Sequence, residues 1–76
     1  MTELKVVLNT VDKVKNFVQI IGEFPEDCDL LSGTYVIDAK SIMGVFSLDL
    51  SKPLLLRIHG ENLDLSPLQE FMYRIS

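Results

Sequence analysis

The order of hydrophobic patterns along the chain predicts an α+β domain, in which one antiparallel sheet has helices on one face. Apolar residues alternate over residues 4–8, and apolar runs fill residues 29–38 and 53–59, which is typical of strands. Helical spacing of apolar residues, or a helix-start signal, marks residues 11–22, 41–48 and 67–75. The predicted order is β-α-β-β-α-β-α, which favours four antiparallel strands in a single sheet.

The first strand and the first helix follow from the residues around their junction. The alternation over residues 4–8 predicts a half-buried strand. Thr10 is predicted to be the N-cap of the helix, because its side-chain oxygen can accept a hydrogen bond from a free backbone N–H of the first turn. Asp12 would lie favourably at the positive end of the helix dipole, and Gly22 is expected to end the helix.

Turn and cap signals place the remaining elements. Ser32 and Gly33 predict the turn of a hairpin within residues 29–38. Ser41 precedes a short apolar stretch and is predicted to cap a helix over residues 41–48. Ser66-Pro67-Leu68-Gln69 matches a capping box with proline at the first helical position, so the last helix is predicted over residues 67–75.

Composition limits the classes of function. The chain has 76 residues, of which 47% are hydrophobic and 24% are charged, so residues 1–76 are expected to form one globular domain. The net charge of −4 disfavours nucleic acid and anionic membrane surfaces as partners. No apolar run approaches the length of a membrane span, and the first residues do not resemble a signal peptide, so a cytoplasmic location is expected.

Residue patterns that carry catalysis or bind metals are not visible in this sequence. There is no glycine-rich phosphate loop and no calcium-loop spacing, so no enzyme activity, no cofactor and no metal are expected. The single cysteine, Cys28, lies between Asp27 and Asp29, and neighbouring carboxylates raise the pKa of a thiol. Cys28 is therefore predicted to be an unreactive small residue.

The stretch KSIMGVFSL at residues 40–48, together with the order of elements, resembles the HPr family. These are small histidine-containing phosphocarrier proteins of the bacterial phosphotransferase system for sugar transport. In the branch of the family with serine regulation, a Lys-Ser-Ile-Met-Gly-Val run opens the second helix, and here it stands at residues 40–45. The resemblance implies an open-faced β-sandwich with strand order 1-4-2-3 and a cytoplasmic role among phosphotransferase components.

The sequence departs from the family at the phosphocarrier site. Family carriers have a Gly-Leu-His-x-Arg-Pro motif before the first helix, and alignment on the helix puts Thr10 at the histidine position, Asp12 at the arginine position and Lys13 at the proline position. A hydroxyl without a neighbouring base is a poorer phosphoryl acceptor than imidazole, and Asp12 would repel the phosphate. His59, the only histidine, is predicted at the end of the fourth strand, away from Thr10. Carrier chemistry is therefore expected to be lost.

Ser41 has two interpretations, a plain N-cap or an N-cap that is also a regulatory phosphorylation site, as the family run implies. In the family, the second helix and the histidine loop together form the surface that meets protein partners. The matching partner-binding residues here are Thr10, Lys40, Ile42, Met43 and Phe46. The last three cannot all point inward from one short helix, so some are expected in the core and some exposed.

These observations lead to competing hypotheses for the function. The first is a non-carrier, HPr-like regulatory or interaction protein, whose partners are phosphotransferase components, a serine kinase or a transcription regulator. The alternative is a phosphocarrier in phosphoenolpyruvate-dependent sugar transport that uses His59 or Thr10 as an unconventional acceptor. A third hypothesis is that the fold has been retained for an unrelated role.

Overall fold

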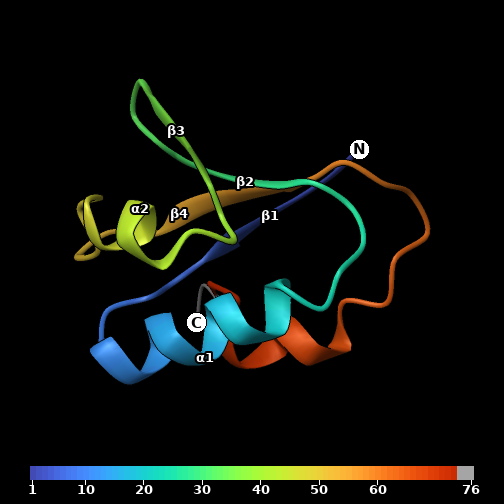
Figure 1. The fold of residues 1–76 in the computed structure, drawn as a ribbon, viewed down its shortest axis with the longest axis horizontal. Coiled ribbons are helices and arrows are strands. Elements are labelled where there is room, and N and C mark those ends of the chain that lie inside the picture. The colour runs from blue at the N-terminus through green and yellow to red at the C-terminus, as the bar shows by residue number, and fades with distance from the viewer. Residues whose placement is uncertain (74–76) are drawn as a thin grey trace.

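A computed structural model describes residues 1–73 and has the α+β architecture that the sequence predicts, with a four-stranded antiparallel sheet and helices on one side of it. Figure 1 shows α1 and η1 packed together below the sheet. No helix among these residues is long and apolar enough to span a bilayer. The elements in chain order are β1 (Thr2–Val6), α1 (Val11–Ile21), β2 (Cys28–Ser32), β3 (Tyr35–Asp38), α2 (Ile42–Phe46), β4 (Leu54–Ile58) and the 3-10 helix η1 (Ser66–Phe71).

The strand order in the sheet is β1-β4-β2-β3, as the resemblance to the HPr family implies. β4 lies between β1 and β2, antiparallel to both. Val6 lies opposite Leu54, and Thr2 lies opposite Ile58. The end of β1 that leads into α1 is therefore beside the start of β4, while the end of β4 lies beside the start of β1.

The β2–β3 hairpin turns at Gly33, where the sequence predicts the turn. Gly33 has a φ of +59°, a left-handed conformation that glycine adopts without a steric cost. Ser32 and Tyr35 pair directly on either side of the two-residue loop. A positive φ at the first loop residue is a feature of the type II′ turn, whose twist matches that of the two strands.

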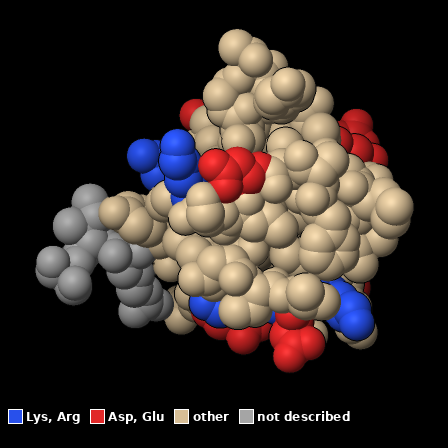
Figure 2. Space-filling model, turned by 90° about the vertical axis from the view of Figure 1, so that its left-hand side faces the viewer, with Lys and Arg blue, Asp and Glu red and all other residues tan. Residues whose placement is uncertain are grey.

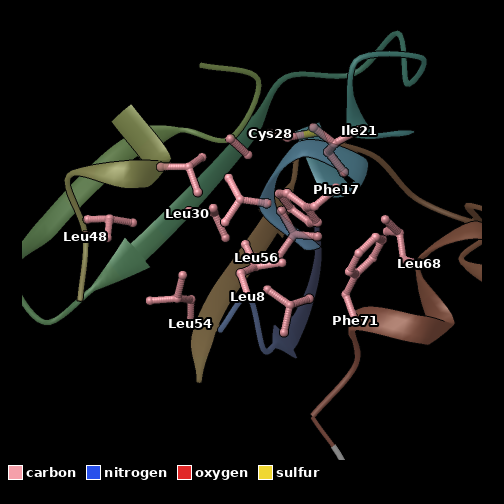
Figure 3. Packing of buried hydrophobic residues seen from close by; sticks show 14 of the residues in the cluster. Leu8, Phe17, Ile21, Cys28, Leu30, Leu48, Leu54, Leu56, Leu68 and Phe71 are labelled. Atoms are coloured by element: carbon pink, nitrogen blue, oxygen red, sulfur yellow. The ribbon is translucent and has the colours of Figure 1, made fainter. Parts of the chain in front are cut away.

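The core lies between the sheet and the helices. Alternate residues of β2 and β4 point toward α1, and three of these, Leu30, Leu56 and Ile58, are fully buried. Phe17 of α1 meets Phe71 of η1 edge to face, with ring centroids 5.5 Å apart (Figure 3). Burying a side chain of this size stabilises a fold by roughly 1.5–3 kcal/mol relative to leaving it exposed. This packing fixes η1 against α1 without a covalent link.

The last element differs from the prediction of a helix over residues 67–75. Residues 66–71 form a 3-10 helix whose N-cap position is Leu65, and that residue makes no side-chain cap. Ser66 does not act as the cap because its backbone N–H and its hydroxyl both donate to the carboxylate of Asp64, at 3.0 and 2.7 Å. Such local side-chain bonds compete with regular helix starts. The capping-box prediction is therefore wrong.

The chain leaves η1 in an extended conformation rather than as a longer helix. The backbone N–H of Val7 donates to the carbonyl of Phe71 at 2.7 Å, and that of Tyr73 donates to the carbonyl of Lys5 at 2.9 Å. Met72 thereby pairs with Val6 as an isolated antiparallel bridge beside the outer edge of β1. The remainder of the predicted helix, residues 74 and 75, lies outside the described part of the chain.

Candidate functional site

Thr10 is the N-cap of α1, as predicted. Its φ of −137° is extended, and its hydroxyl oxygen accepts a hydrogen bond from the backbone N–H of Lys13 at 3.1 Å. Asp12 lies in the first turn of the helix. The position that the alignment matches to the carrier histidine thus holds a hydroxyl that caps α1, with the carboxylate of Asp12 two residues away.

A shallow pocket of about 550 Å³ lies where the start of α1 faces the end of α2 and the loop that follows it. Val11, Phe46 and Leu50 supply its apolar lining, while Asn9, Thr10 and Ser51 supply its polar groups. Val11 is the first residue of α1, and its apolar side chain is 56% exposed. The pocket therefore joins the start of α1 and the α2 region into one surface.

Helix α2 is a single short turn that shows apolar side chains to solvent. Ser41 is its N-cap, as predicted, and the Ser41 oxygen accepts a hydrogen bond from the backbone N–H of Gly44 at 3.3 Å. Met43 is 78% exposed and Phe46 is 39% exposed. Ile42 is also on the surface.

The expectation that some of Ile42, Met43 and Phe46 would be in the core is wrong. Val45 and Leu48 hold α2 to the core instead, since both are buried. Five residues give little more than one turn, so only one side of this helix can face inward, and Val45 occupies that side. All three side chains in question are consequently on the surface.

Lys40 does not direct its ammonium group to Ser41. Its Nζ donates to the backbone carbonyl of Phe24 at 2.6 Å, and its backbone N–H donates to the carboxylate of Asp38 at 2.9 Å. Lys40 therefore ties the turn before α2 to the segment that follows α1. This contact explains how a charged, half-buried side chain contributes to placing α2.

Three serine hydroxyls lie around α2, and their hydrogen bonds differ. The Ser47 hydroxyl donates to the carbonyl of Gly44 at 2.6 Å. The Ser51 hydroxyl donates to the carboxylate of Asp49 at 2.5 Å, and this bond is the main reason that the pKa of Asp49 is lowered. Within residues 1–73, the Ser41 hydroxyl accepts one hydrogen bond and donates none. Ser41 alone of the three keeps its hydrogen free.

His59 lies at the other end of the sheet from Thr10, where the sequence places it. It follows the end of β4, whose last residue, Ile58, lies opposite Thr2 at the start of β1. Its Nε2 lies 2.7 Å from a carboxylate oxygen of Asp29, and its backbone N–H donates to the carbonyl of Asp27 at 2.9 Å. His59 is thus not part of the pocket beside Thr10.

Cys28 is buried on the inner face of β2. Its pKa is raised, first by burial, while Lys40 opposes the shift and Glu26 adds to it. The sequence predicts the direction of this shift, but attributes it to neighbouring carboxylates, which contribute less than burial. Residues 1–73 contain no cluster of three His, Cys, Asp or Glu side chains placed to bind a metal ion.

Few charged side chains lie near the centre of the face that carries α2 and the start of α1. Figure 2 turns this side of the molecule toward the viewer, and most of the visible surface belongs to uncharged residues. One acidic group (red) lies near the middle of this view, and the other charged side chains lie mainly toward its edges. Sequence reasoning finds Thr10, Met43 and Phe46 for this face. It misses Asn9, Leu50 and Ser51, because a loop after α2 brings the last two to the pocket.

Comparison with known proteins identifies the fold class as HPr-like. No family model and no curated protein matches the sequence. A crystal structure of HPr-C-His from Thermoanaerobacter tengcongensis is similar, with a TM-score of 0.72 and 22% sequence identity over 91% of this chain and 84% of that chain. The similarity to that protein is one of fold: the strand order 1-4-2-3 with helices on one side.

Proposed function

We propose that this chain is a non-enzymatic, HPr-like interaction protein that binds protein partners and carries no phosphoryl group at Thr10. The binding region is the α1–α2 surface, which we define as Thr10, Val11, Ile42, Met43 and Phe46. Lys40 contributes indirectly, because its bond to the Phe24 carbonyl holds the turn before α2 in place. The partners proposed are phosphotransferase components, a serine kinase or a transcription regulator.

The observation that carries the proposal is the group of exposed apolar side chains around the pocket. Val11 and Met43 are more than half exposed. Phe46 lines the pocket together with Val11, and Met43 lies on the same short helix as Phe46. Methionine is flexible and polarizable, so it adapts to different partner surfaces. An exposed apolar patch of this kind marks an interaction site, and the pocket can take one apolar anchor from a partner.

The polar groups at the same place support binding rather than phosphoryl transfer. Thr10 offers a hydroxyl rather than an imidazole, and its oxygen caps α1 by accepting a hydrogen bond from the backbone N–H of Lys13. Asp12 puts a negative charge close to any incoming phosphate, where family carriers have arginine. His59 offers an imidazole, but it lies at the far end of the sheet and is held by Asp29.

Ser41 is the proposed site of regulation on this surface. Its hydroxyl hydrogen is free, whereas those of Ser47 and Ser51 are already donated to a carbonyl and a carboxylate. A phosphate there would add about −1.5 to −2 charges beside the exposed Met43, on a face with few other charges. The modification would therefore change which partner the surface accepts.

Incubation with ATP and an HPr-type serine kinase tests both parts of the proposal. Intact-mass measurement is expected to show one added phosphate on the wild type and on the Ser47→Ala and Ser51→Ala variants, and none on Ser41→Ala. Labelling of Ser41→Ala, or no labelling of the wild type, would refute the assignment of the site.

The kinase also serves as a probe of docking. Met43→Ala is expected to slow phosphorylation of Ser41 by about tenfold, because a buried apolar contact of this size is worth about that factor. Tyr35→Ala is the matched control, since Tyr35 is an exposed large side chain outside the surface. Equal rates for both variants would contradict a docking role for α2.

A further inference from the structure

Strand β3 forms one edge of the sheet, and no strand among residues 1–73 pairs with its outward side. At the other edge, Met72 bridges to Val6 of β1. Open edges are templates for further strands, and proteins usually protect them with lysine, proline or a bulge. The sequence of β3 is Tyr-Val-Ile-Asp, and its pairing with β2 is regular, so it has none of these three devices. Figure 1 shows β3 at the top of the molecule, apart from α1 and η1.

The hydrogen bonds of the hairpin show which backbone groups of β3 face outward. The backbone N–H of Ala39 donates to the carbonyl of Cys28 on β2 at 2.9 Å. Backbone groups alternate in direction along an antiparallel strand, so those of Ile37 also point toward β2, while those of Val36 and Asp38 point away from it. The Asp38 carbonyl accepts the N–H of Ser41 at 3.0 Å. The open edge therefore offers the N–H and carbonyl of Val36 and the N–H of Asp38.

The side chains of Val36 and Asp38 lie on the face of the sheet that points away from α1. Ile37 between them points to the helix side, since it lies opposite the buried Leu30 and packs against the core. Val36 is 58% exposed and lies opposite Leu31. Asp38 is also exposed. A strand added beside β3 would thus meet an apolar side chain at one position and a carboxylate two residues further along β3.

The carboxylate of Asp38 lies beside a second carboxylate. Asp38 is directly opposite Asp29 on β2. Asp29 is 2.7 Å from the Nε2 of His59, and Arg57 on its other side donates to Glu3 instead, at 2.8 Å. Neither carboxylate has a lysine or arginine partner among residues 1–73. Like charges directly opposite each other destabilise a sheet, so a basic residue next to Asp38 would stabilise this one.

We propose that β3 binds an extended segment of a partner protein, which joins the sheet as a fifth strand antiparallel to β3. Strand addition of this kind takes its affinity from backbone hydrogen bonds and its specificity from alternate side chains. In the antiparallel direction, the residue opposite Asp38 comes two positions before the residue opposite Val36. The segment therefore has Arg or Lys, then any residue, and then an apolar residue.

Charge favours a foreign basic segment over a second copy of this chain. β3 contains no basic residue that a second β3 could place opposite Asp38. The net charge of −4 also opposes self-association. The proposed segment uses none of the residues of the α1–α2 surface, so the two contacts are independent of each other.

The test is a titration of the whole chain with the peptide acetyl-Ser-Thr-Arg-Thr-Val-Thr-Ser-amide, followed by amide NMR spectra. Because only three backbone groups are available, the expected dissociation constant is about 1 mM. The largest shifts are expected at the N–H groups of Val36 and Asp38. At about 5 mM peptide, exchange of these two amides with water should slow about sixfold, whereas that of Ile37, already bonded to β2, should change little.

Two altered peptides separate backbone pairing from charge. N-methylation of the peptide valine removes the donor that would bond to the Val36 carbonyl, and binding is expected to be lost. Replacing the peptide arginine with glutamate puts a third carboxylate beside Asp38 and Asp29. The arginine peptide is expected to bind roughly two- to fivefold more tightly than the glutamate peptide.

Asp38→Asn tests the charge from the protein side. It keeps a side-chain oxygen for the backbone N–H of Lys40, which Asp38 accepts at 2.9 Å. The preference for the arginine peptide is expected to shrink in Asp38→Asn. It should be unchanged in Glu70→Gln, the matched control, which removes an exposed negative charge from η1. Circular dichroism checks that both variants are folded.

Several results would overturn the proposal. These are no shifts at about 5 mM arginine peptide, shifts centred outside β3, equal binding of the N-methylated peptide, or a preference for arginine that survives Asp38→Asn unchanged. Shifts of Val36 and Asp38 that depend on protein concentration in the absence of peptide would also overturn it, because a second copy would then occupy the edge.

Discussion

Replacing Ser41 with alanine removes the cap of α2, and the structure sets the expected loss of stability. Loss of an N-cap costs about 0.5–2 kcal/mol of the free energy of unfolding. Here the Ser41 oxygen accepts one exposed hydrogen bond at 3.3 Å, which is longer than the optimum of about 2.9–3.0 Å. Helix α2 has only five residues. Both facts place Ser41→Ala near the low end, at about 0.5 kcal/mol.

Urea unfolding followed by circular dichroism measures this loss, with Thr10→Ala as the matched comparison. Thr10 caps the eleven-residue α1 through a shorter bond of 3.1 Å, so Thr10→Ala is expected to cost about 1 kcal/mol. Ser41→Asp keeps an oxygen acceptor at the cap and is expected to remain close to the wild type. A loss above about 2 kcal/mol for Ser41→Ala, or an equal loss for Ser41→Asp, would refute the role assigned to the cap.

Three other outcomes are expected. The wild type should take no acid-labile phosphate from phosphoenolpyruvate and Enzyme I, because Thr10 has a hydroxyl in place of an imidazole. Thr10→His should also take none, because Asp12 repels the phosphate, whereas Thr10→His combined with Asp12→Arg should gain one phosphate by intact mass. Cys28 should react with Ellman's reagent at least about tenfold more slowly in the folded than in the urea-unfolded protein, because burial raises its pKa and blocks access. The pKa of Asp64 is lowered by the hydroxyl and then the N–H of Ser66, so its contribution to stability is present above the ordinary aspartate pKa and lost as pH falls through the lowered value. Asp64→Asn should therefore lower the Tm at neutral pH and have no effect below that lowered pKa.

Local signals in the sequence predict the elements whose hydrogen bonds are local. Thr10 and Ser41 are caps because each bonds to an N–H three residues later, which a single sequence can indicate. The prediction of the last helix is wrong for a related reason, since Ser66, which was expected to cap that helix, donates its hydrogen bonds to Asp64 instead. The sequence contains both Asp64 and the capping pattern at Ser66, but it does not show which of the two sets of hydrogen bonds forms.

Contacts between distant segments are the part that the sequence does not predict. The bridge between Val6 and Met72 and the bond from Lys40 to the Phe24 carbonyl both depend on how the chain folds back. The pocket beside Thr10 needs Leu50 and Ser51, which a loop carries there. Strand order was expected from the resemblance to HPr proteins, because patterns along one chain do not specify which strands pair.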